Sequence, residues 1–193
     1  MKTTIKKYLV VIVMMLVTSI NYANKNTAVK IVDGKKVRIE FESVKKGHTL
    51  SVKDKNGTVI YSQEIENSGT YSKVLDLSKL EKGNYTTELE KDFEIVIKPF
   101  TVLDGQVSFD EEKTIFKPVI RTEDNLVLIS KLAFDKQPLK IAIYYNDEVI
   151  FSETVKDEKN LLKRVYKLSK EEKGDYKVII NSNNRSYIKD FNI

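Results

Sequence analysis

Cysteine is absent from this chain of 193 residues, which also holds a single histidine and only three prolines. Without cysteine the chain forms no disulfide and carries no lipid-modified cysteine, so packing alone must hold its fold together. A Ser-His-Asp device would have to use the one histidine, His48, which we expect in a solvated loop. A histidine-based metal site would need further histidines. We therefore expect no catalytic, metal-ligating or cofactor-binding residues.

The sequence repeats itself with an offset of about 91 residues. The segment Leu77–Tyr85 returns as Leu168–Tyr176, and Val59–Ser62 returns as Val149–Ser152. Order, spacing and residue type agree in the two copies. The chain therefore contains two similar modules, each with its own core.

The first 23 residues read as a secretory signal peptide, with a basic start followed by the apolar run Leu9–Ile20 and a small residue, Ala23, at a plausible cleavage point. An uncleaved N-terminal anchor is the alternative. Removal of residues 1–23 takes away three lysines, which lowers the formal net charge from +5 to +2. Since this remainder is nearly neutral, we expect no nucleic-acid partner and no membrane span in the mature chain.

Alternation of apolar and polar residues dominates the rest of the chain. Val37, Ile39 and Phe41 alternate with charged residues, as on a strand with one face buried. Asn56-Gly57 predicts a tight hairpin turn, and Asn146-Asp147 stands at the matching place in the second copy. Prolines are too few to interrupt many strands. We expect an all-β fold of two tandem immunoglobulin-like or fibronectin-like antiparallel β-sandwiches.

The repeat also sets the expected domain limits, which are a first module at 27–102 and a second at 103–193. Residues 106–121 have no counterpart in the first copy and are expected to form an extra hairpin of the second module. Residues 161–168 have apolar residues at helical spacing, but their counterparts read as a strand, so we predict a strand. The linker is so short that the modules should be held end to end.

A leucine, a glycine and a tyrosine recur at fixed spacing in both copies. Gly83 and Gly174 would give the backbone freedom to re-enter the next strand, which Tyr85 and Tyr176 would begin. In immunoglobulin-like sandwiches such a tyrosine bonds back to the crossing loop through its hydroxyl. We therefore interpret these four residues as a structural corner.

Part of each copy resembles the C-terminal sorting domains of proteins exported by the type IX secretion system. The resemblance spans about 50 residues per copy and implies a secreted bacterial β-sandwich. The Asn-Pro element that opens such domains is missing, the first copy is internal, and Glu171 replaces a leucine of the motif in the second copy. The segments that carry the resemblance in the first copy are Leu50–Val52, Asn56-Gly57, Val59–Tyr61, Leu77–Tyr85 and Phe93–Lys98.

Five apolar or aromatic residues of the second copy are candidates for partner contacts. Tyr144 should face away from the buried side of its strand. The others lie on or before a strand that is apolar on both faces, so one face must meet the extra hairpin, the first module or a partner. These further candidates are Phe116, Ile120, Val127 and Ile129.

The sequence as a whole predicts an exported, non-enzymatic protein that binds a protein or glycan of the cell envelope or has a structural role there. A location in the periplasm, on the outer surface or outside the cell is compatible with it. A small secreted hydrolase, which would need two converging carboxylates, or an inhibitor of one is the alternative. A C-terminal module that serves as a sorting signal is a further alternative.

Overall fold

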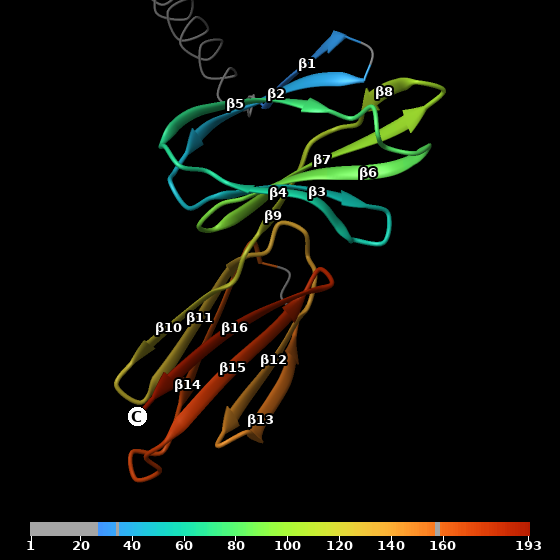
Figure 1. The fold of residues 1–193 in the computed structure, drawn as a ribbon. Coiled ribbons are helices and arrows are strands. Elements are labelled where there is room, and N and C mark those ends of the chain that lie inside the picture. The colour runs from blue at the N-terminus through green and yellow to red at the C-terminus, as the bar shows by residue number, and fades with distance from the viewer. Residues whose placement is uncertain (1–26, 34, 157–158) are drawn as a thin grey trace, which may run out of the picture.

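The computed structural model describes residues 27–193, except 34, 157 and 158, and all regular structure in this part of the chain is antiparallel β (Figure 1). The expected signal peptide, residues 1–23, lies outside the described residues. Within the described part, no helix is long and apolar enough to cross a membrane.

The first module packs the three-stranded sheet β1-β2-β5 against a six-stranded sheet. The larger sheet has the order β4-β3-β6-β7-β8, and β9 also pairs with β7. The strands of this module are β1 (Thr27–Asp33), β2 (Lys36–Val44), β3 (Thr49–Asp54), β4 (Val59–Glu64), β5 (Gly69–Asp76), β6 (Gly83–Glu90), β7 (Glu94–Leu103), β8 (Gln106–Phe109) and β9 (Lys113–Phe116).

The second module packs the three-stranded sheet β10-β11-β14 against the four-stranded sheet β13-β12-β15-β16. Its strands are β10 (Val119–Glu123), β11 (Leu126–Leu132), β12 (Leu139–Tyr145), β13 (Glu148–Val155), β14 (Leu161–Lys167), β15 (Asp175–Ser182) and β16 (Arg185–Asn192).

The two modules have the same strand order once β8 and β9 are set aside. Strands β1 to β7 correspond in order to β10 to β16, and each pairing of the first module recurs in the second. The predicted strand at 161–168 is confirmed as β14. The turn between β12 and β13 holds Asn146 (φ 46°) and Asp147 (φ 66°) at positive φ, as a tight hairpin requires.

Each module has a separate hydrophobic core, so the expectation of two tandem β-sandwiches is confirmed. Val37, Ile39 and Phe41 are buried in the first core, as their alternation predicts. The second core is built around Ile141, Ile143 and other alternating residues of β11, β12 and β15. In Figure 1 the two modules lie end to end, with β9 at the junction.

The segment 106–121 differs from the expected hairpin of the second module. Strand β8 pairs with Phe100–Leu103 of β7, and β9 pairs with Glu94–Ile97 of the same strand. Both therefore extend the larger sheet of the first module, and the second module begins with β10. The physical reason is that β7 would otherwise be a free sheet edge, which takes up neighbouring strand segments readily.

Candidate binding surface at the module junction

The tyrosine of each expected corner bonds back to the crossing loop of its module. The hydroxyl of Tyr85 donates a hydrogen bond of 3.0 Å to the carbonyl of Glu81, and that of Tyr176 donates one of 2.9 Å to the carbonyl of Glu172. Burial raises the pKa of Tyr176, which stacks on Phe191 within the second core. Each hydroxyl thereby ties its tyrosine to the loop that precedes its strand.

The two corner glycines differ, contrary to expectation. Gly174 has a φ of +153°, and a Cβ there would lie 3.0 Å from the ring of Tyr145. Gly83 has no positive φ, and a Cβ there would make only ordinary contact with Tyr85. Of the two, only Gly174 therefore requires the conformational freedom of glycine.

Three charged side chains join the modules. Glu88 of β6 accepts hydrogen bonds from Lys53 (2.6 Å) of the first module and Arg185 (2.7 Å) of the second. Burial alone would raise the pKa of Glu88, but these hydrogen bonds outweigh it and hold the pKa below its ordinary value. Since Leu89 faces the core, Glu88 lies on the outer face of its sheet, where the second module covers it.

A second polar cluster lies within the second module. The fully buried ammonium of Lys131 donates hydrogen bonds to Asp135 and to Ser182. Asn183, in the turn between β15 and β16, donates a hydrogen bond of 2.7 Å to the same Asp135. The β15–β16 turn is thereby held against the loop that follows β11.

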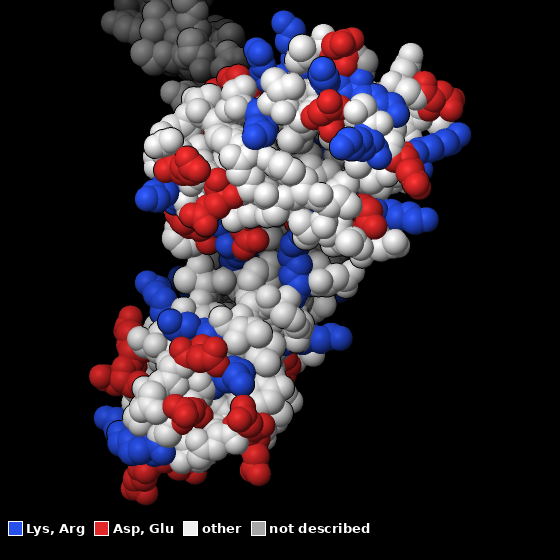
Figure 2. Space-filling view, viewed as in Figure 1, with Lys and Arg blue, Asp and Glu red and all other residues white. Residues whose placement is uncertain are grey.

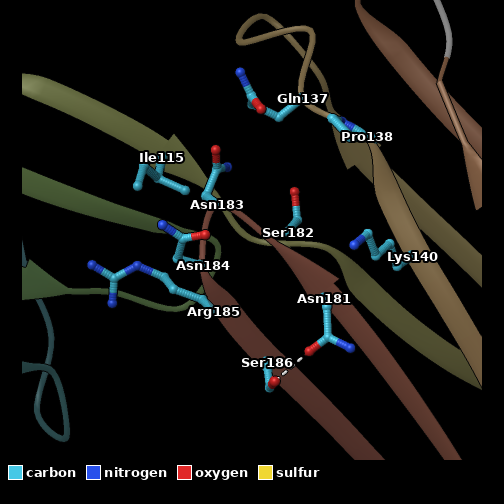
Figure 3. Close-up of a pocket in the computed structure, with 10 residues that line it drawn as sticks. All are labelled: Ile115, Gln137, Pro138, Lys140, Asn181, Ser182, Asn183, Asn184, Arg185 and Ser186. Carbon is cyan, nitrogen blue, oxygen red and sulfur yellow. Dashed lines mark hydrogen bonds between the residues drawn. The ribbon is translucent and has the colours of Figure 1, made fainter.

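A crevice of about 600 Å³ opens beside this turn (Figure 3). Ile115 reaches it from the first module, and the other lining residues come from the second. Most of its lining side chains are amides, hydroxyls or the cations Lys140 and Arg185, and none of them is a carboxylate. We call this the junction crevice, and its lining residues from the second module are Gln137, Pro138, Lys140, Asn181, Ser182, Asn183, Asn184, Arg185 and Ser186.

The junction crevice continues onto the outer face of the sheet β13-β12-β15-β16. A shallower hollow shares Lys140 and Asn181 with the crevice and extends to Ala142 and Ser152. Strand register places Tyr144 next to Val149 on this face, with Ala142 beside Ile179. We call this surface the outer face; its apolar members are Ala142, Tyr144, Val149, Ile179 and Ile188.

The structure separates the five candidate partner residues. Val127 and Ile129 are 0% and 2% exposed in the second core, so they are not available to a partner. Ile120 packs partly buried against the same core. Phe116 makes an edge-on ring contact with Phe134 at the junction.

Tyr144 is partly buried and belongs to the outer face, on the side of β12 opposite Ile141 and Ile143. Of the five candidates, Tyr144 is the one that belongs to the outer face. Sequence reasoning missed the amides of the β15–β16 turn, because only the fold brings them beside Lys140.

His48 differs from the expected solvated residue. It is buried in the turn between β2 and β3, where its Nδ1 accepts a hydrogen bond of 3.0 Å from the backbone N–H of Lys45. Burial lowers its pKa, although Asp92, with an oxygen 3.6 Å from Nε2, opposes the shift. His48 therefore stabilises a turn.

Acidic side chains gather at the far end of the second module, in a hollow of about 680 Å³. Asp147 pairs with Lys177, and Asp175 accepts a hydrogen bond from Asn192. In the described part of the chain no three His, Cys, Asp or Glu side chains form a group that could hold a metal ion. Figure 2 shows charges of both signs interspersed on the visible face of each module.

Comparison with solved structures finds immunoglobulin-like and fibronectin-like domains. A two-domain fibronectin type-III segment of chicken tenascin is 14% identical, covers 88% of this chain and 98% of its own, and has a TM-score of 0.29. The human OSCAR ligand-binding domain is 8% identical, with coverages of 86% and 96% and a TM-score of 0.25. Scores this low carry no argument about ligand or partner.

The comparison with curated proteins gives no match. Residues 17–102 match the family model described as "Domain of unknown function (DUF3244)". The matched segment ends at Val102, which closes the first copy of the repeat, and the second copy lies outside it.

Proposed function

We propose that this chain is an exported, non-enzymatic binding protein whose outer face and junction crevice hold a glycan of the cell envelope. The observation that carries the proposal is the continuity of the amide-rich and hydroxyl-rich crevice with a sheet face that bears Tyr144. Amides and hydroxyls donate and accept hydrogen bonds, as sugar hydroxyls require. An aromatic ring offers an apolar face with a polar tip.

Spacing along β12 supports an extended ligand. Lys140 in the crevice and Tyr144 on the outer face are four residues apart, which corresponds to about 13 Å along a strand. A ligand of several sugar units spans that distance. The similarity to sorting domains stays a prediction.

Retention on an envelope fraction tests the proposal. Wild-type protein should bind envelope material treated with protease and should lose binding after periodate oxidation of the sugars. Tyr144→Ala should weaken retention by about tenfold or more, as loss of a central aromatic contact does. Phe93→Ala, which removes a highly exposed aromatic from the first module, is the matched control and should bind normally.

Binding that survives periodate and is lost after protease treatment would show a protein partner instead. Equal retention of Tyr144→Ala and wild type would remove the outer face from the proposal.

A further inference from the structure

The last strand of the larger sheet has different pairing partners in the two modules. In the first module β7 pairs with β8 and β9 on the side away from β6. Its counterpart β16 pairs with β15, and no described strand pairs with its other side. The fold thus accepts antiparallel strands at this edge in one module and leaves the same edge open in the other.

The opposite edge of the four-stranded sheet is also open. Strand β13 pairs only with β12 among the described strands, and it exposes Val149, Ile150 and Phe151 in succession. Ile150 is the extra residue of a bulge, because Ile143 pairs with Phe151 and Tyr144 with Val149. Neither lysine nor proline, which commonly protect sheet edges, occurs in β13.

We infer that β13 of one copy of this chain adds to the β16 edge of a second copy. Each pairing from β13 through β12 and β15 to β16 is antiparallel, so β13 and β16 run in opposite directions. A second copy in the same orientation therefore presents its β13 antiparallel to β16 of the first. The contact is head-to-tail and does not close, so it builds chains of copies.

The charged residues of β13 and β16, and the sheet face on which their apolar residues lie, both favour one register between the two strands. When Val149 lies opposite Ile188, Glu148 lies opposite Lys189. Val149 and Ile188 both belong to the outer face and are 56% and 57% exposed. Glu148 and Lys189 are exposed, and no described residue forms an ion pair with either. A β13–β13 contact would instead bring together two edges whose only charged residues are acids.

Sheet twist separates the first modules of neighbouring copies. Adjacent strands rotate by about 20–25°, so a copy added across four strands is turned by roughly 80–100°. The contact shares Val149 and Ile188 with the outer face, but edge pairing leaves that face open and joins the outer faces of successive copies.

Engineered cysteines test this register directly, since the chain has no cysteine of its own. Residues opposite each other on antiparallel strands have Cα atoms about 4.5–5.5 Å apart, within disulfide range. Val149→Cys mixed with Ile188→Cys should form a disulfide-linked dimer under mild oxidation. Val149→Cys mixed with Asp190→Cys is the off-register control and should not.

The double variant Val149→Cys/Ile188→Cys should form a ladder of linked oligomers, because each copy contributes both edges. Within one copy these residues lie three strands apart, about 14 Å, which is too far for a disulfide. No more linkage than in the off-register control, or equal linkage in Val149→Cys alone, would overturn the inference.

Charge exchange gives a second test in the cysteine-free chain. Lys189→Glu should weaken self-association in sedimentation velocity by about tenfold or more, and Glu148→Lys/Lys189→Glu should restore it. Lys55→Glu, a reversal at an exposed residue of the first module, should leave association unchanged. A monomeric wild type at every concentration, or no rescue in the double variant, would contradict the β13–β16 contact.

Discussion

The guanidinium of Arg185 donates a hydrogen bond of 2.7 Å to the carboxylate of Glu88, and the two residues are 97 positions apart in the chain. This contact joins β16 of the second module to β6 of the first. It lies beside the junction crevice, so the same bond that fixes the modules also fixes one wall of the candidate site.

Replacement of Arg185 by alanine should loosen the junction. Glu88 keeps Lys53 as a partner, so we expect a loss of about 1.5–3 kcal/mol in the free energy of unfolding. Small-angle scattering should show a broader range of module orientations. Lys177→Ala, which removes an exposed ion pair with Asp147, is the control and should cost much less. Identical scattering of Arg185→Ala and wild type would show that the bond does not hold the modules.

The free energy of unfolding should decrease as pH falls, because His48 takes up a proton more readily in the unfolded chain. Burial lowers the pKa of this histidine below 6.5, and Lys91 and Lys45 add to the shift against the opposing effect of Asp92. The unfolded chain therefore takes up the proton first, and the free energy of unfolding decreases as pH falls from above 6.5 towards the folded pKa.

His48→Asn keeps an acceptor for the N–H of Lys45 and does not titrate. Urea unfolding of this variant between about pH 7.5 and 5.5, the range around the ordinary histidine pKa, should lack the contribution of His48. The same pH dependence in both proteins would contradict the buried, neutral histidine.

The hydrogen bonds of the two corner tyrosines should contribute differently to the free energy of unfolding. Tyr176→Phe removes a hydrogen bond at a buried ring and should cost about 1 kcal/mol. Tyr85→Phe removes a more exposed bond and should cost less. Urea unfolding of both variants measures the difference, and a larger loss in Tyr85→Phe would argue against burial as its cause.

The corner glycines allow a matched comparison. Gly174→Ala should destabilise the second module by about 1–3 kcal/mol, because its φ of +153° is strained for alanine and Tyr145 blocks the methyl group. Gly83→Ala should be nearly neutral. Thermal unfolding of the two variants measures these losses of stability. Equal losses in both variants would contradict the difference in backbone conformation.

Much of the fold was predictable because alternation and the repeat report on local structure. Val37, Ile39 and Phe41 alternate with charges and are buried together. Alternation does not encode which sheet edge a strand joins, so the place of residues 106–116 was predicted wrongly. Their pairing with β7 depends on the free edge that the first module offers.

The candidate site was harder to predict because sequence does not tell which face of a strand is covered. Leu126 and Leu128 alternate with Val127 and Ile129, so both faces of β11 read as apolar. The structure buries the second pair in the core and leaves the first pair partly exposed. His48 was misplaced for a related reason, since its burial depends on the turn that it closes.

Hydrogen exchange with and without protease-treated envelope material is the sharpest test of the proposed ligand surface. We predict slower exchange in β12, in β15 and in the turn between β15 and β16, with no change in the first module's sheet β1-β2-β5. Protection confined to that sheet, or no protection on binding, would contradict a ligand surface on the second module.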